Sequence, residues 1–160
     1  MKVINILHDS IVDGAGFRSV VFFSGCIHHC HGCHNPQSWN ITNGKDMSQA
    51  DIFTELIENE LTNVTLSGGD PFLQSKEVSE LAKALKDAGK NIWCYTGYLF
   101  EDLLGNPFHR HLLEQIDVLV DGPFELAKRD LSLLYKGSNN QRIIDVPRSL
   151  TDGRIQLYKQ

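Results

Sequence analysis

Three of the four cysteines lie within one short segment, at positions 26, 30 and 33, and four histidines lie beside them. Thiolates and imidazoles are common metal ligands, so this segment could hold zinc, haem iron or an iron–sulfur cluster. In a reducing compartment, clustered cysteines usually indicate metal or redox chemistry rather than disulfides. The segment from Cys26 to Asn35 is therefore the first candidate for a functional site.

Four interpretations of this segment compete. A structural zinc site usually takes two separated pairs of ligands, and no second pair follows downstream. Residues 30–34 match the C-x-x-C-H pattern of haem attachment, but that modification normally takes place outside the cytoplasm and no export signal is present. A loop with thiols of no function leaves three cysteines at such short gaps unexplained. A [4Fe–4S] cluster held by Cys26, Cys30 and Cys33 fits best.

A cluster with three cysteine ligands has one iron without a protein ligand. An open metal position is typical of reactive rather than structural sites, and a small molecule with nitrogen and oxygen donors could occupy it. Cys94 lies within an apolar stretch, where a cysteine usually behaves as a small buried hydrophobe. We therefore expect Cys94 to pack in the core rather than to complete the cluster.

Alternating strand-like and helix-like segments surround the candidate site. Apolar runs predict strands at Arg18–Ser24, Asn63–Leu66, Ile92–Tyr95 and Asp117–Val120, and a less regular tail precedes Arg142–Val146. Helices are expected after a cap at Ser48, before Gly89 and after Asn106. This order predicts a single α/β domain over residues 1–160, with a mainly parallel sheet and crossover helices.

Unusual residues follow each of the four expected strands. The cysteine segment follows the first, Gly68-Gly69-Asp70-Pro71 the second, Thr96-Gly97 the third and Asp121-Gly122-Pro123 the fourth. Active sites of open α/β sheets and barrels gather at the carboxyl ends of parallel strands. We therefore expect these four segments to form one site.

Length and charge narrow the possible classes. A complete eight-stranded barrel usually takes about 250 residues, so a chain of 160 residues could hold only a truncated, partial TIM-type barrel. The net charge of −5 gives no basic footprint for nucleic acid or an anionic membrane. The N-terminal residues do not read as a signal peptide and no apolar run could span a bilayer, so we expect a cytoplasmic protein.

On these motifs, the chain resembles the radical S-adenosylmethionine (SAM) enzymes. The C-x3-C-x2-C spacing of its cysteines is that family's signature, and residues 68–71 resemble the family's GGEP motif with Asp in place of Glu. Residues 13–18 and 33–36 resemble the activases of glycyl-radical enzymes, and residues 136–145 are most like those that act on anaerobic ribonucleoside-triphosphate reductases. The resemblance extends from about Asp9 to Val146.

The resemblance implies a reaction and a set of binding residues. SAM would chelate the open iron, and its reductive cleavage would yield a 5′-deoxyadenosyl radical that removes hydrogen from a glycine of the partner enzyme. Because cofactors perform such chemistry, no catalytic proton-transfer residue is assigned. The residues implied to bind SAM are Gly32, Cys33, His34, Asn35, Gly68, Gly69 and Asp70.

The reasons to expect SAM near these residues differ from one to the next. Gly68 and Gly69 lack Cβ, which would let the backbone approach the methionyl group closely. Asp70 is expected to hold the turn or a polar group of SAM, and Asn35 either to contact SAM or to start an Asn-Pro turn. Gly32 stands where many family members carry an aromatic residue near the adenine, so that contact must come from His34, from the backbone at 32–33 or from elsewhere.

The implied partners are the large subunit of the anaerobic reductase and a low-potential electron donor such as flavodoxin or ferredoxin, with no nucleic acid and no membrane. Two alternatives remain, an activase of another glycyl-radical enzyme of the pyruvate formate-lyase type and an electron-transfer iron–sulfur protein. A pure electron carrier would protect its cluster with a fourth ligand, which argues against the last. Ordinary salt bridges are expected at Arg18, Asp121 and Arg142, and surface positions at His109 and His111.

Overall fold

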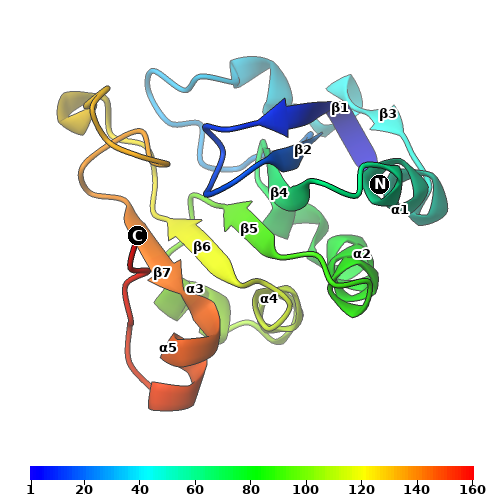
Figure 1. Ribbon diagram of the computed structural model, residues 1–160. Coiled ribbons are helices and arrows are strands. Elements are labelled where there is room, and N and C mark those ends of the chain that lie inside the picture. The colour runs from blue at the N-terminus through cyan, green and yellow to red at the C-terminus, as the bar shows by residue number, and fades with distance from the viewer.

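Seven strands form one open sheet in the computed structural model, which describes residues 1–160 (Figure 1). In sheet order they are β3 (Lys45–Asp46), β1 (Lys2–Ser10), β2 (Arg18–Phe23), β4 (Asn63–Gly68), β5 (Ile92–Tyr95), β6 (Val118–Asp121) and β7 (Arg142–Asp145). The four central strands, β2, β4, β5 and β6, pair in parallel. The outer strands β1, β3 and β7 pair antiparallel, so the sheet is mixed.

Five α-helices accompany the sheet and lie along one side of it in Figure 1. They are α1 (Gln49–Glu58), α2 (Ser75–Asp87), α3 (Phe100–Leu104), α4 (Pro107–Leu113) and α5 (Val146–Asp152). Two of the expected caps form, since the Ser48 side chain accepts from the Asp51 N–H and Asn106 accepts from the Phe108 N–H. None of these helices combines the length and the apolar character needed to cross a membrane.

The two faces of the sheet are covered differently. Alternate side chains of β5 show this, because Cys94 joins the large core under the helices while Trp93 packs on the other face. On that other face Trp93 meets the rings of Tyr135 and Tyr158, which belong to the loop before β7 and to the C-terminal tail. Loops rather than helices therefore cover the second face.

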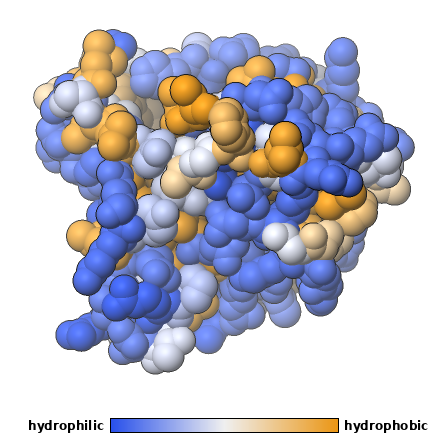
Figure 2. Space-filling model, viewed as in Figure 1, coloured by the Kyte–Doolittle hydropathy of each residue, from blue (hydrophilic) through white to orange (hydrophobic).

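Apolar side chains are also exposed at the loops. Figure 2 shows this view of the molecule as mainly hydrophilic, with apolar patches concentrated in its upper half. The exposed apolar residues of the loop between β1 and β2 and of the loop after β6 are Ile11, Val12, Phe17, Leu126, Leu131 and Leu134.

The four strands expected from apolar runs lie where the sequence placed them, and so does β7. Sequence reasoning assigned no structure to β1, β3, α3 or α5. β1 pairs antiparallel on the sheet's outer side and most of its residues are only partly buried or exposed, so it carries no continuous apolar run. The sheet has two free edges, at β3 and β7, and its description as a truncated barrel stays a prediction.

Candidate metal and cofactor site

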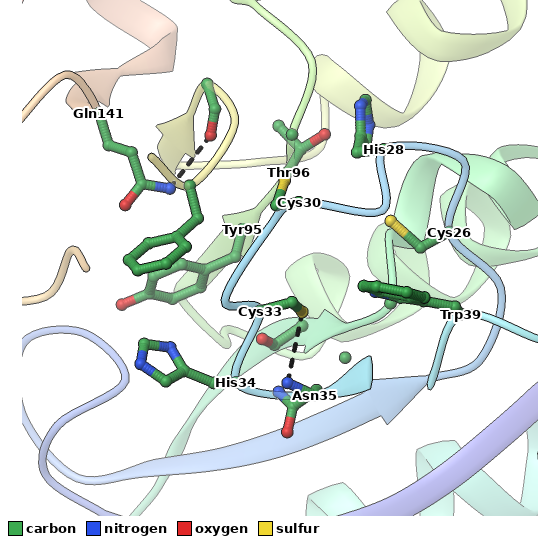
Figure 3. A pocket seen from close by; sticks show the side chains of 16 residues that line it. Cys26, His28, Cys30, Cys33, His34, Asn35, Trp39, Tyr95, Thr96 and Gln141 are labelled. Carbon is green, nitrogen blue, oxygen red and sulfur yellow. Dashed lines mark hydrogen bonds between the residues drawn. The ribbon is translucent and has the colours of Figure 1, made fainter. Parts of the chain in front are cut away.

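A cavity of about 150 Å³ lies at the carboxyl ends of the four parallel strands (Figure 3). Its lining includes Cys26, Cys30 and Cys33 after β2, Gly68 and Gly69 after β4, Thr96 and Gly97 after β5, and Gly122 after β6. The expectation that these four segments form one site is confirmed.

The cysteines are carried by a loop of residues 25–39, called here the cysteine loop. Its two ends meet, since the Gly25 N–H donates to the Ser38 carbonyl at 2.6 Å and the Cys26 N–H donates to the Trp39 carbonyl at 3.1 Å. This closure brings Trp39 to the cavity beside Cys26 (Figure 3). Trp39 could not be predicted from the sequence, because only the return of the chain through a short 3-10 helix at Pro36–Ser38 places it there.

The three loop thiols are partly exposed and can reach a bound group. Burial raises the pKa of the Cys26 thiol, and the backbone N–H groups of His28 and His29 oppose that rise. The Asn35 N–H lies 3.4 Å from Cys33 Sγ, and donors of this kind tune iron–sulfur clusters. A thiol that coordinates a metal is deprotonated and its proton leaves to solvent, so the raised pKa is no obstacle to binding.

No three His, Cys, Asp or Glu side chains lie close enough together to hold a single metal ion. The thiols of Cys26, Cys30 and Cys33 instead border one cavity from separate points of the loop. This donor set fits a [4Fe–4S] cluster, whose cysteine ligands attach to different iron atoms.

Cys94 does not line the cavity. It is fully buried in β5 and belongs to the core under the helices. Burial raises the pKa of its thiol well above the ordinary value. The expectation that Cys94 packs as a small hydrophobe is confirmed.

Gly68 and Gly69 line the cavity, and their missing Cβ atoms also have a packing reason that the sequence did not show, while the expected approach to SAM stays a prediction. A Cβ on Gly68 would run into the Phe23 backbone, and one on Gly69 would run into the Gly25 carbonyl. Main-chain hydrogen bonds join the same segments, from the Gly69 N–H to the Phe23 carbonyl and from the Asp70 N–H to the Gly25 carbonyl, both at 2.8 Å. The two glycines therefore let the ends of β2 and β4 pack backbone against backbone.

Asp70 is buried behind the cavity and does not line it. Its carboxylate accepts from the Phe72 N–H at 3.0 Å, the Thr96 hydroxyl at 2.9 Å, the Gly97 N–H at 3.0 Å and His28 Nε2 at 2.9 Å. Of the two roles expected for Asp70, these contacts provide the first, which is to hold the turn. The second, a contact with SAM, stays a prediction.

Of the remaining SAM-binding candidates, some border the cavity and one does not. Asn35 precedes the 3-10 helix, but its side chain makes no capping bond and instead borders the cavity. His34 also borders the cavity and packs against Phe124, with ring centroids 5.2 Å apart. Gly32 lies outside the lining, where its positive φ of 77° forms a turn and a Cβ would approach Leu126.

A second cavity of about 540 Å³ adjoins the first. The two share His34, Asn35, Tyr95, Phe124 and Gln141 in their linings. The second continues between the loop after β1, where Val12 and Asp13 contribute, and residues 129–137. Sequence reasoning did not single out Tyr95, Phe124 or Gln141, although Tyr95 ends β5 and Phe124 follows Gly122-Pro123, which are strand-end positions.

Two expectations about charged residues need correction. Arg18 is buried without a carboxylate partner, and donates instead to Thr65 Oγ1 at 2.7 Å and to the carbonyls of Ala15, Val64 and Asn91. Burial lowers its pKa to about 10. His109 is only partly exposed, because it packs on the rings of Phe72 and Tyr98.

The salt bridge expected at Asp121 and Arg142 does form. Arg142 donates to Asp121 Oδ1 at 2.9 Å and to Glu101 Oε2 at 2.8 Å. It thereby joins β7 to β6 and to α3. His111 is exposed, as expected.

Comparison with known proteins agrees with a cysteine-bound cluster. A family model described as a 4Fe-4S single cluster domain matches residues 12–144. The chain therefore belongs to the class of single-cluster 4Fe-4S proteins.

Several curated proteins share most of the chain. Proteins named anaerobic ribonucleoside-triphosphate reductase-activating protein are 36% identical in Pasteurella multocida (89% of this chain, 96% of the relative) and 36% identical in Escherichia coli K12 (82% and 90%). One from Enterobacteria phage T4 is 35% identical (82% and 86%). The chain is a member of the family of anaerobic ribonucleoside-triphosphate reductase-activating proteins.

Proposed function

We propose that this chain activates an anaerobic ribonucleoside-triphosphate reductase by generating a glycyl radical on it. Cys26, Cys30 and Cys33 would hold a [4Fe–4S] cluster, which would supply the electron for cleavage of SAM to methionine and a 5′-deoxyadenosyl radical, and that radical would take a hydrogen atom from the glycine. The chain's own residues would bind the cluster, orient SAM and exclude water, and none of them has to move a proton.

Cys26, Cys30 and Cys33 would hold three irons, and SAM would chelate the fourth through its amino and carboxylate groups. Cys33, His34, Asn35, Gly68 and Gly69 line the cavity and would contact SAM directly. Gly32 and Asp70 would act from behind the lining, by shaping the loop and the turn. The rings of His34, Tyr95 and Phe124 offer apolar faces on which the adenine could pack.

The observation that most supports this function is the position of the fourth cysteine. Three thiols border the cavity, while Cys94 is buried in the core and does not line it. A cluster in this cavity would therefore keep one iron available to a substrate. A pure electron carrier, the alternative from another class, gains nothing from an open iron.

The partner would be the large subunit of the reductase, and the electron would come from a low-potential donor such as flavodoxin or ferredoxin. The relatives' names support the first of these, since they describe activation of that reductase. An activase for a glycyl-radical enzyme of the pyruvate formate-lyase type is the alternative partner assignment.

The test is anaerobic incubation of the reconstituted chain with the reductase, SAM and dithionite. We expect a glycyl-radical signal in electron paramagnetic resonance (EPR) on the reductase, matched by release of 5′-deoxyadenosine. The controls are omission of SAM and the Cys26→Ala variant, neither of which should give the signal. Absence of 5′-deoxyadenosine with an intact, reducible cluster would favour the electron-carrier alternative. A radical on pyruvate formate-lyase but not on the reductase would change the partner.

A further inference from the structure

Residues 27–34, which carry two of the three cysteines, have few attachments to the rest of the molecule. Their backbone makes no hydrogen bond to the sheet, and the one main-chain bond between them runs from the Cys33 N–H to the Cys30 carbonyl. The single hydrogen bond that joins them to residues outside the cysteine loop is the 2.9 Å contact of His28 Nε2 with Asp70 Oδ2. This hydrogen bond can therefore hold residues 27–34 in position against the sheet.

The contact is well shielded from water. The His28 side chain retains 16% of its exposure and the Asp70 side chain 1%. Since a carboxylate oxygen accepts, the ring nitrogen of His28 donates. Hydrogen bonds to charged groups are among the stronger ones in proteins, and shielding from water strengthens them further.

The His28 ring is also held from its sides. The Tyr98 ring meets it edge to face, with centroids 4.6 Å apart. A Cβ on Gly97 would lie 2.5 Å from His28 Cδ2, so the ring rests directly on the Gly97 backbone. The φ of Gly97 is not positive, and close approach of the ring is thus the reason that this position suits glycine.

Asp70 does not depend on His28 to keep its own place. Its carboxylate still accepts from Phe72, Thr96 and Gly97, which hold the turn after β4 against the end of β5. Removing the His28 donor therefore leaves the other hydrogen bonds of the Asp70 carboxylate in place and releases only the cysteine loop.

We propose that His28 is a positioning residue, whose hydrogen bond to Asp70 fastens the cysteine loop to the ends of β4 and β5 and keeps Cys30 and Cys33 at the distance from Cys26 that a cluster requires. The inference rests on the proposed ligation by the three loop cysteines. The proposal also gives the motif at residues 68–71 a role in holding the metal site, since Asp70 binds the cysteine loop from behind the cavity.

The test compares His28→Phe, which keeps the ring and removes the donor, with His28→Gln, which keeps an N–H donor of similar reach. Iron release from the reconstituted protein to a chelator is followed anaerobically without SAM. We expect release about tenfold faster from His28→Phe and near the wild-type rate from His28→Gln. His31→Phe is the matched control, since His31 is exposed in the same loop and makes no hydrogen bond.

A second pair of variants tests the same contact from the other side. Gly97→Ala should push the ring away and speed iron release, whereas Gly105→Ala, whose Cβ would meet only an ordinary contact at 3.5 Å, should not. Thermal unfolding of the metal-free variants checks that each one folds. If His28→Phe does not fold, the comparison of Gly97→Ala with Gly105→Ala decides the question.

Wild-type iron release from both His28→Phe and Gly97→Ala, or equal acceleration by His31→Phe, would overturn the proposal. Cys26→Ala in the same assay separates this outcome from a failure of the proposed function. If Cys26→Ala cannot hold iron while His28→Phe holds it normally, only the positioning role is wrong. If Cys26→Ala retains a normal cluster, the ligand assignment itself is wrong.

Discussion

At the scale of single residues, the four cysteines differ in what surrounds them, and this difference predicts their roles. Alanine at Cys26, Cys30 or Cys33 should each abolish stable cluster assembly, because each removes a thiol from the cavity wall. Cys94→Ala should keep the cluster and cost about 1 kcal/mol of stability, as expected for a small core truncation. Iron and sulfide content after reconstitution measures the first effect and denaturant unfolding the second. Cluster loss in Cys94→Ala with retention in a loop variant would reverse the assignment.

Gly69 gives a second prediction at this scale, and it differs from the one that the sequence suggests. A glycine that merely admits SAM could be changed without loss of the cluster. Because a Cβ here would run into the Gly25 carbonyl, Gly69→Ala should disturb the start of the cysteine loop. We expect a loss of about 1–3 kcal/mol, typical of overpacking, together with reduced iron content.

Denaturant unfolding of the metal-free chain measures this loss, with Gly105→Ala as the control at an uncrowded glycine. Unchanged stability and iron content, combined with weaker SAM binding, would restore the simpler view that Gly69 only makes room for the cofactor.

At the scale of elements, the sequence predicts the position of the site better than its contacts. The apolar strands and the motifs that follow them placed the cavity at the correct edge of the sheet, because strand ends converge whatever the details of packing. The sequence did not predict Trp39 or the His28–Asp70 contact, because each depends on how one loop returns over another. The packing role of Gly68-Gly69 was missed for a similar reason, since only the structure shows which backbone lies against them.

The ion pair between β7 and α3 gives a pH-dependent prediction for these elements. Hydrogen bonds from Arg142 lower the pKa of the Glu101 carboxyl below its ordinary value. The pair therefore adds stability above the unfolded-state pKa, and this stability is lost as the pH falls through the lower folded-state value. Since Glu101 is more than half exposed, solvent screening limits the effect to about 0.5 kcal/mol.

Glu101→Gln tests this by removing the titrating group and keeping its size. Between pH 6 and pH 3, the stability of the variant should fall less steeply than that of the wild type in denaturant unfolding at matched ionic strength. A parallel decline in the two proteins would show that the pair contributes nothing. Glu125→Gln is a suitable control, since the partner of Glu125 is the nearby Lys128 within one turn.

At the scale of the whole molecule, the cavities lack a cover on one side. Helices cover one face of the sheet. The cavity bordered by the cysteines continues into the larger, second cavity, which lies between the loop after β1 and residues 129–137. The carbon-centred radical of the proposed reaction would have to be kept from water and stray hydrogen donors. We therefore expect the glycine-bearing loop of the reductase to complete that enclosure.

Apolar side chains at the mouth of the larger cavity suggest how the reductase would dock. Val12 is 70% exposed and Leu131 is 85% exposed, and both line that cavity. Burial of such residues on binding is favourable, and a charge placed among them opposes it. Val12→Asp and Leu131→Asp should therefore lower the yield of glycyl radical about tenfold at limiting reductase concentration, with partial recovery when the reductase is raised.

The matched control is Leu61→Asp, because Leu61 is 88% exposed but lines neither cavity. EPR spin counts on the reductase and 5′-deoxyadenosine release are measured together, with and without the reductase. Cleavage of SAM should be slow or wasteful in its absence and coupled to radical formation in its presence. Two results would show that the reductase does not close the site through this surface. One is rapid SAM cleavage whose rate is the same with and without the reductase, and the other is an equal loss of glycyl-radical yield in Leu61→Asp and Val12→Asp.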